Sequence, residues 1–74
     1  MTDLLLDVEP VTPRWVILKD KYSIHTEYSD VKGDDCWEAY TNEPEREFFG
    51  STEKEAVVGL IQKFRLDGWQ DVSL

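Results

Sequence analysis

His25 and Cys36 are the residues of this chain whose types suit nucleophilic catalysis, and each is the single member of its kind among 74 residues. A cysteine–histidine pair also needs a third group that orients the histidine and a site for the oxyanion. The sequence contains no recognisable pattern for an orienting group or for an oxyanion site. His25 also falls on the polar side of an alternating segment. We therefore expect an ordinary surface histidine, no catalytic residue and no enzymatic activity.

Four acids near the middle of the chain have the ligand chemistry that a calcium ion prefers: Asp30, Asp34, Asp35 and Glu38. A calcium loop between two helices needs acids at alternate positions, a central glycine and a glutamate at its end. These acids do not follow that spacing, and they stand between predicted strands, which favours a solvated acidic loop. The sequence also lacks a phosphate-binding glycine loop and a zinc quartet, so we expect no metal and no cofactor.

The net charge of −8 is concentrated in the middle of the chain. Residues 30–55 contain nine acids and three bases, whereas residues 1–29 contain five acids and three bases and residues 56–74 two of each. Nucleic-acid affinity depends on Lys and Arg side chains that neutralise phosphates, so direct nucleic-acid binding is not expected. A basic surface on another protein, either a host protein or a toxin, is the expected partner.

Aromatic residues framed by charge are typical of protein-binding surfaces. Trp37 and Tyr40 stand beside dense acid in one predicted strand, and their odd spacing places them on opposite sides of it. One of the two rings is therefore expected on the face away from the helix; the alternative is that both rings fill a small core. The candidate partner-binding residues are Asp34, Asp35, Trp37, Tyr40, Glu43, Glu45 and Glu47.

One cysteine excludes the internal disulfide framework that secreted domains of this size usually have. No run approaches the roughly 18 apolar residues of a membrane span. Leu4–Leu6 stand between Asp3 and Asp7, which is not the pattern of a signal peptide. The sequence therefore predicts a cytoplasmic protein without a membrane partner.

Residues 1–13 are predicted to form an extended N-terminal arm, because Pro10 and Pro13 remove backbone donors and disfavour helix at the residues before them. Leu4–Leu6 make this arm apolar enough to lie against another surface. Two alternatives stay open: the arm covers its own core, or it docks on a partner or a second copy. Residues 14–74 are predicted to form a single β-β-β-(β)-α domain.

Strand patterns occur in four segments of that domain. Trp15–Leu18 is a continuous run of aromatic and β-branched residues, and Tyr22–Tyr28 alternates with period two. Cys36–Thr41 and Arg46–Phe49 are shorter candidates, joined by Asn42–Glu45, which has turn chemistry with a proline. The sheet is therefore predicted to have three or four antiparallel strands.

A helix is predicted after these strands. Thr52 is a favourable N-cap, and Glu55 completes a capping box with it. Gly68 is predicted at the left-handed position just past the helix, which pairs Trp69 with Phe64 in a Schellman motif. The apolar stripe predicted to face the sheet consists of Val57, Leu60, Ile61 and Phe64. The fold class is thus α+β, a three- or four-stranded antiparallel sheet packed against one C-terminal helix.

The run Phe49-Gly50-Ser51-Thr52-Glu53-Lys54-Glu55-Ala56 resembles the strand-to-helix junction of HicB-like domains, and the predicted strand order is similar to their β-β-β-α core. The resemblance covers about half of the chain and implies a partial ribonuclease-H-like fold. It also implies an antitoxin that binds and blocks a small basic toxin. Residues 42–47 depart from the family's proline- and glycine-containing segment, and no DNA-binding tail follows, so DNA binding is not implied.

The expected function is therefore that of a small acidic protein-binding module. Its length, acidity and lack of active-site motifs are similar to those of phage and prophage inhibitor proteins, some of which place carboxylates where nucleic-acid phosphates would bind. The predicted module is an inhibitor or antitoxin-like protein that engages a basic surface, including one that binds nucleic acid. The alternative is a structural or scaffolding protein that self-associates, and a homodimer stays open.

Overall fold

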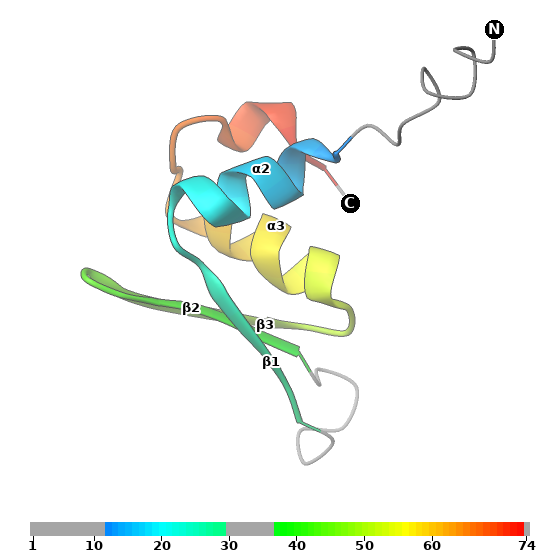
Figure 1. The fold of residues 1–74 in the computed structure, drawn as a ribbon, viewed down its shortest axis with the longest axis vertical. Coiled ribbons are helices and arrows are strands. Elements are labelled where there is room, and N and C mark those ends of the chain that lie inside the picture. Colours follow the sequence, from blue (N-terminus) through cyan, green and yellow to red (C-terminus); the bar gives the residue numbers. More distant parts are fainter. Residues whose placement is uncertain (1–11, 30–36, 74) are drawn as a thin grey trace, which may run out of the picture.

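A computed structural model describes residues 12–29 and 37–73 of the chain (Figure 1). The described part has the predicted α+β fold, with a three-stranded antiparallel sheet packed against a C-terminal helix. The elements, in chain order, are α2 (Arg14–Lys21), β1 (His25–Tyr28), β2 (Trp37–Asn42), β3 (Glu45–Gly50), α3 (Glu53–Lys63) and the 3-10 turn η2 (Trp69–Asp71). No helix among these elements is long and apolar enough to cross a membrane.

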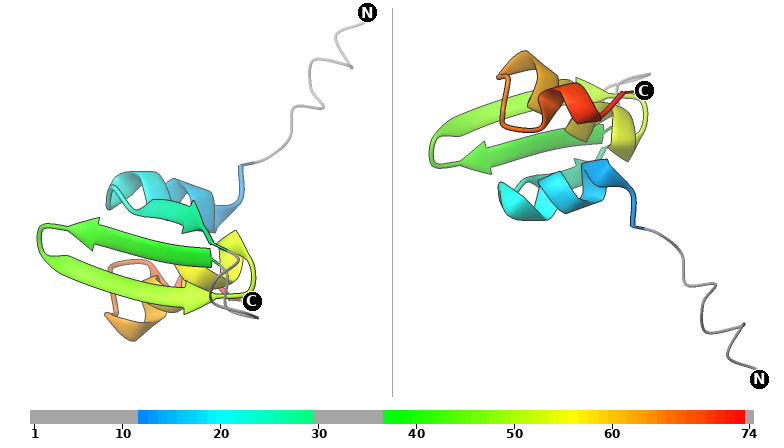
Figure 2. Two further views of the ribbon diagram at one scale, coloured as in Figure 1. Left: turned by 90° about the horizontal axis from the view of Figure 1, so that it is seen from below. Right: turned by 90° about the horizontal axis from the view of Figure 1, so that it is seen from above.

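The sheet has the order β1-β2-β3, with β2 in the centre. Tyr40 pairs with His25 of β1 and with Glu47 of β3, which fixes the register of all three strands. Because side chains alternate across a strand, each strand presents one set of residues to the helices and the other set to the opposite side. Both helices lie on the same side of the sheet, and no element of residues 12–29 and 37–73 covers the other side (Figures 1 and 2). We call this other side the open face.

Helix α3 begins as the sequence predicts. The Thr52 hydroxyl accepts a hydrogen bond from the Glu55 backbone N–H at 3.0 Å. The Glu55 carboxylate in turn accepts bonds from the backbone N–H and the hydroxyl of Ser51, at 2.6 and 2.7 Å. The reciprocal bond therefore reaches one residue further back than in a simple capping box. These bonds satisfy donors that the first turn of a helix otherwise leaves without a partner.

Helix α3 supplies half of the buried hydrophobic residues of the described part, five of ten. Val57, Leu60 and Ile61 are fully buried, as predicted. Phe64 is 39% exposed, so its assignment to the sheet-facing stripe is wrong. The helix ends at Lys63, and Phe64 is its capping residue, which turns the ring outward beneath the side chains of Arg46 and Lys63.

Helix α3 lies unusually close to β3 at Gly59. A Cβ added there would stand 2.1 Å from a ring carbon of Phe48, so the ring occupies the space of the missing side chain. Gly50, where β3 leads into the α3 cap, is constrained in the same way, since its Cβ would lie 2.7 Å from the Ala56 backbone nitrogen. Two glycines therefore set how closely the helix and the strand approach each other.

The predicted first strand, Trp15–Leu18, is wrong: these residues lie in α2. Trp15, Leu18 and Tyr22 face the core at helical spacing, while Ile17 is 44% exposed. Trp15, Leu18 and Tyr22 are three and then four positions apart, which is the spacing of one helix face. The continuous apolar run from Trp15 to Leu18 fits a covered strand as well, so this spacing was not decisive. The predicted second strand is correspondingly shorter, because Tyr22 caps α2 and β1 begins at His25.

Both helices end in a Schellman motif with a residue other than glycine in the left-handed conformation. At α2 this residue is Ser23, with φ of 53°, and at α3 it is Arg65, with φ of 50°. In each case the following residue, Ile24 or Leu66, donates to the carbonyl five positions back and is buried. Gly68 does have a positive φ, of 93°, but it begins η2 rather than ending α3. The predicted pairing of Trp69 with Phe64 is therefore wrong.

The segment after α3 folds back against both helices. The Tyr22 hydroxyl donates to the Asp67 carbonyl at 3.0 Å, and the Gln62 amide donates to the Val72 carbonyl at 2.9 Å. A solvent-exposed ion pair joins Arg14 to Asp71 at 3.4 Å. The C-terminal segment thereby links the start of α2 to the last turn of α3. Of the predicted arm, residues 1–11 lie outside the described residues, and Pro13 is the N-cap of α2.

Ser23→Gly should raise the free energy of unfolding by about 0.5–1 kcal/mol, because glycine adopts the left-handed conformation without the penalty of a Cβ. Chemical denaturation followed by far-ultraviolet circular dichroism measures the change. Asp20→Gly is the matched control, since it places glycine at a right-handed position of the same helix and should destabilise. A destabilising Ser23→Gly would show that the left-handed position is assigned to the wrong residue.

Gly59→Ala should lower the free energy of unfolding by about 1–2 kcal/mol, because the added methyl displaces the Phe48 ring. In a Phe48→Ala background the same substitution should instead stabilise by up to about 1 kcal/mol, since alanine favours a helix over glycine. Urea denaturation of the four proteins in this cycle tests the contact. Equal effects in the two backgrounds would contradict the close approach.

Candidate functional site

The open face carries eight strand side chains, assigned to it by the alternation and the register. None of these strand positions holds a lysine or an arginine, and four hold glutamate. The set consists of His25, Glu27, Glu38, Tyr40, Asn42, Glu45, Glu47 and Phe49. Figure 2 shows this side of the sheet in its left view, with both helices behind it. The open face is therefore an acidic surface with aromatic residues among its acids.

Tyr40 lies at the centre of the open face. Its ring is 5.3 Å from that of His25 between centroids, with the two planes tilted by 31°. Partial loss of solvent raises the pKa of the Tyr40 phenol above its ordinary value of 10.0, and the carboxylates of Glu27 and Glu38 raise it further. A hydrogen bond with Glu27 adds to the same effect. The phenol is therefore held neutral as a hydrogen-bonding group inside a ring of negative charge.

A shallow hollow of about 260 Å³ surrounds Tyr40 on this face. The carboxylates of four residues line it, and Arg46 reaches its border from the other side of β3. The four glutamates are Glu27, Glu38, Glu45 and Glu47. Three strands contribute to the lining, so its shape depends on the register of the sheet and not on one loop. Such a hollow suits an extended cationic side chain, which forms charge-assisted hydrogen bonds with carboxylates.

Two of these acids oppose each other directly. Glu27 of β1 is the cross-strand partner of Glu38 of β2. Like charges directly opposite in an antiparallel pair destabilise the sheet. Glu38 lies between Glu27 on one side and Phe49 on the other, so this pair of carboxylates stands in the middle of the face.

The structure divides the predicted partner-binding residues. Tyr40, Glu45 and Glu47 lie together on the open face. Glu43 lies in the turn between β2 and β3 and is exposed. Trp37 faces the helices, where it packs against the core and meets the Tyr28 ring edge-on at 5.4 Å. Asp34 and Asp35 lie outside the described residues.

Sequence reasoning did not include Glu27 and Glu38 among the partner-binding candidates. The sequence does contain an indication for Glu27, because the alternation of its segment places it on the same polar side as His25. Glu38 appeared as a candidate calcium ligand with Asp30, Asp34 and Asp35, and those three aspartates lie outside the described residues. Within residues 12–29 and 37–73, no group of three or more His, Cys, Asp or Glu side chains is placed to hold a metal ion.

Comparison with known proteins adds no assignment. No family model matches the chain, and no curated protein or solved structure matches it. The resemblance to HicB-like domains, which depends on the junction around Thr52, therefore stays a prediction.

Glu27→Gln should lower the pKa of Tyr40 toward its ordinary value, because the substitution removes a carboxylate that opposes ionisation. Tyrosine Cζ chemical shifts followed through alkaline titration measure this pKa. Since the folded-state pKa is raised, the contribution of Tyr40 to stability is present below pH 10 and is lost as the pH rises through the folded-state value. Wild type should therefore lose stability more steeply in alkali than Tyr40→Phe, and equal slopes would contradict the assignment.

Proposed function

We propose that this chain is a protein-binding module that holds a basic surface of another protein against its open face. It acts by binding and not by catalysis. The observation that carries the proposal is the charge of that face: four glutamates and no basic residue at its eight strand positions. A surface of one sign attracts an oppositely charged partner over a distance and orients it before contact.

The cross-strand pairing of Glu27 with Glu38 also supports this proposal, because it places two carboxylates side by side on the open face. A lysine or arginine of the partner would form charge-assisted hydrogen bonds with such a pair.

The aromatic residues of the face supply the apolar part of the proposed contact. Tyr40 offers a neutral hydroxyl, and the rings of His25 and Phe49 lie on the same face. An aromatic centre surrounded by polar groups is the usual arrangement of an interface. In the more specific form of the proposal, the module is an inhibitor of phage or prophage type, or an antitoxin-like protein. It would cover a nucleic-acid-binding site of its target, with the glutamates taking the places of phosphates.

A second candidate function is self-association through the sheet. In the described residues β1 and β3 each pair with a strand on one side alone, so each has an outer edge that could pair with another chain. β3 carries Glu45 and Glu47 beside that edge, and such charges discourage edge pairing. Binding of a basic partner is therefore the better supported candidate. The two differ in salt dependence, since association led by charge weakens as ionic strength rises.

Replacing Glu27, Glu45 and Glu47 together by Lys should slow association with the natural partner roughly tenfold or more at low salt. The partner is first captured with the wild-type chain from the source cells and identified by mass spectrometry, and surface plasmon resonance then gives the rates. Raising the salt concentration to about 0.5 M should shrink the difference, because the Debye length falls well below its physiological value of about 8 Å.

The matched control reverses three exposed acids of the helical side, Asp20, Asp67 and Asp71. It changes the net charge by the same amount, so it separates the placement of charge from its total. Circular dichroism checks that both variants keep the fold. Equal losses of association in the two variants, or an unchanged rate after the open-face reversal, would refute the proposal.

A further inference from the structure

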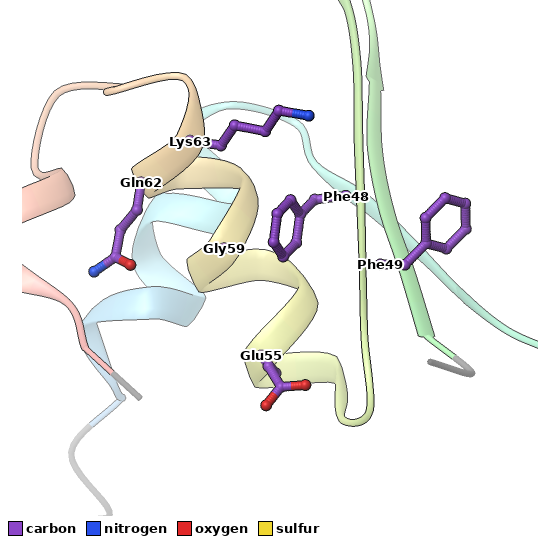
Figure 3. Close-up of a pocket in the computed structure, with 6 residues that line it drawn as sticks. All are labelled: Phe48, Phe49, Glu55, Gly59, Gln62 and Lys63. Carbon is purple, nitrogen blue, oxygen red and sulfur yellow. The ribbon is translucent and has the colours of Figure 1, made fainter. Parts of the chain in front are cut away.

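The edge of β3 that faces away from β2, which we call the outer edge, is bordered by two hollows. The larger, of about 510 Å³, lies between α3 and β3 (Figure 3). Phe48 points from β3 toward the helix, and Gly59 has no side chain to fill the surface of α3 beside it. The ring and the bare helix thus form an apolar floor on the helix side of the edge. The full lining consists of Phe48, Phe49, Glu55, Gly59, Gln62 and Lys63.

The second hollow, of about 370 Å³, continues along the same strand and shares Lys63 with the first. Its lining consists of Glu45, Arg46, Glu47, Lys63 and Phe64. It therefore joins the end of α3 to two glutamates whose side chains belong to the open face. Because β2 occupies the inner edge of β3, a hollow that joins the two sides of the sheet passes the outer edge. Together the two hollows follow β3 along most of its length.

The backbone of the outer edge offers the hydrogen-bonding groups of a strand. No strand of residues 12–29 and 37–73 pairs with it, since β3 pairs with β2 alone in this part of the chain. Alternate residues of an edge strand direct their N–H and C=O groups away from the sheet. β3 has six residues and β1 has four, so β3 offers the longer edge. An extended segment can add to such an edge as a further strand.

The two sides of this edge differ in the side chains that they favour. Side chains of an added strand would alternate between the open face and the helix side. On the open face they would meet Glu45 and Glu47, which are both exposed. Opposite charges on neighbouring strands stabilise a sheet, so lysine or arginine is favoured there.

The helix side of the edge favours apolar side chains and repels basic ones. The Lys63 ammonium lies 5.9 Å from the centre of the Phe48 ring and 5.4 Å from that of Phe64. The Arg46 guanidinium lies over the same Phe64 ring, at 5.8 Å. These rings supply apolar area, and the two cations oppose a third positive charge. Basic side chains are therefore accepted on one side of the edge only.

We propose that the outer edge of β3 binds an extended segment of the basic partner protein, in which lysine or arginine alternates with apolar residues. The basic side chains lie beside Glu45 and Glu47, and the apolar ones lie against Phe48 and Phe64. This inference rests on the proposed function and gives its mode of binding. The same charges disfavour a second copy of β3 at this edge, because it would bring further glutamates beside Glu45 and Glu47.

A synthetic peptide, acetyl-Lys-Val-Lys-Val-Lys-Val-amide, tests the proposal on the full-length, isotope-labelled chain. In NMR titrations the backbone amides of residues 45–48 should shift and exchange more slowly with solvent, whereas those of β1 should not. Acetyl-Lys-Lys-Lys-Val-Val-Val-amide has the same composition and charge without the alternation, and it should bind several-fold more weakly. The alternating peptide with every backbone nitrogen methylated keeps its charges but lacks strand donors, and it should lose the protection of β3.

The charge requirement is tested by replacing Glu45 and Glu47 together by Gln, which should weaken binding of the alternating peptide roughly tenfold. The matched control replaces Asp20 and Asp67, two exposed acids of the helical side, by Asn. It removes the same charge and should leave the affinity nearly unchanged. Equal losses in the two variants would show that total charge, and not the edge, governs binding.

The other outcomes overturn the strand mode and leave the proposed function to its own test. If the methylated peptide binds equally well and shifts Tyr40 in place of β3, basic segments lie on the open face without strand pairing. Absence of a saturable shift with the alternating peptide also overturns the inference. If the amides of β3 are protected without peptide and sedimentation equilibrium shows a dimer, a second copy occupies the edge. The proposed function fails separately, when the captured natural partner ignores the open-face reversal.

Discussion

The contact between Phe48 and Gly59 is the constraint on which the rest of this domain depends. Because the ring lies where a side chain of Gly59 would be, α3 lies directly on β3. Gly50 fixes a second point, where the backbone of the strand meets the start of the helix at Ala56. Two points on one strand determine the position and direction of the helix. The fully buried Val57, Leu60 and Ile61 then pack against the β2–β3 hairpin as a consequence.

The core of the described residues is built on one side of the sheet. Both helices and the C-terminal segment lie on one side of the sheet, and by the alternation of side chains every strand directs a second set of residues to the open face. Most small antiparallel sheets place mixed polar residues on such a side. Here the register brings Glu27, Glu38 and Glu47 around Tyr40, and it raises the pKa of the phenol through loss of solvent and through carboxylate charge. The acidity of the open face is thus a property of the pairing and not of any single segment.

The parts of the fold that the sequence predicted are those decided by local chemistry. Thr52 and Glu55 cap α3 because their spacing is sufficient for the bonds they make, and the turn before Glu45 follows from its residue types. Trp15–Leu18 was misassigned because an apolar run of four residues fits a covered strand and a short helix equally well. Arg65 ends α3 in a conformation that glycine favours, and no sequence rule would have selected it over Gly68. A related reason explains why only part of the site was predicted. Glu27 and Glu38 were missed because they are brought together by the register of the strands, which tertiary packing determines.

The charges of this small protein are separated along the same axis as its layers. The strand positions of the open face are acidic, while Arg46, Lys63 and Arg65 gather over Phe48, Phe64 and Trp69 near the end of α3. A cation over an aromatic ring keeps part of its charge available to a third group, because the ring does not neutralise it. Lys63 and Arg65 therefore lie on the opposite side of the sheet from the glutamates of the open face. Such an arrangement orients a charged molecule before contact.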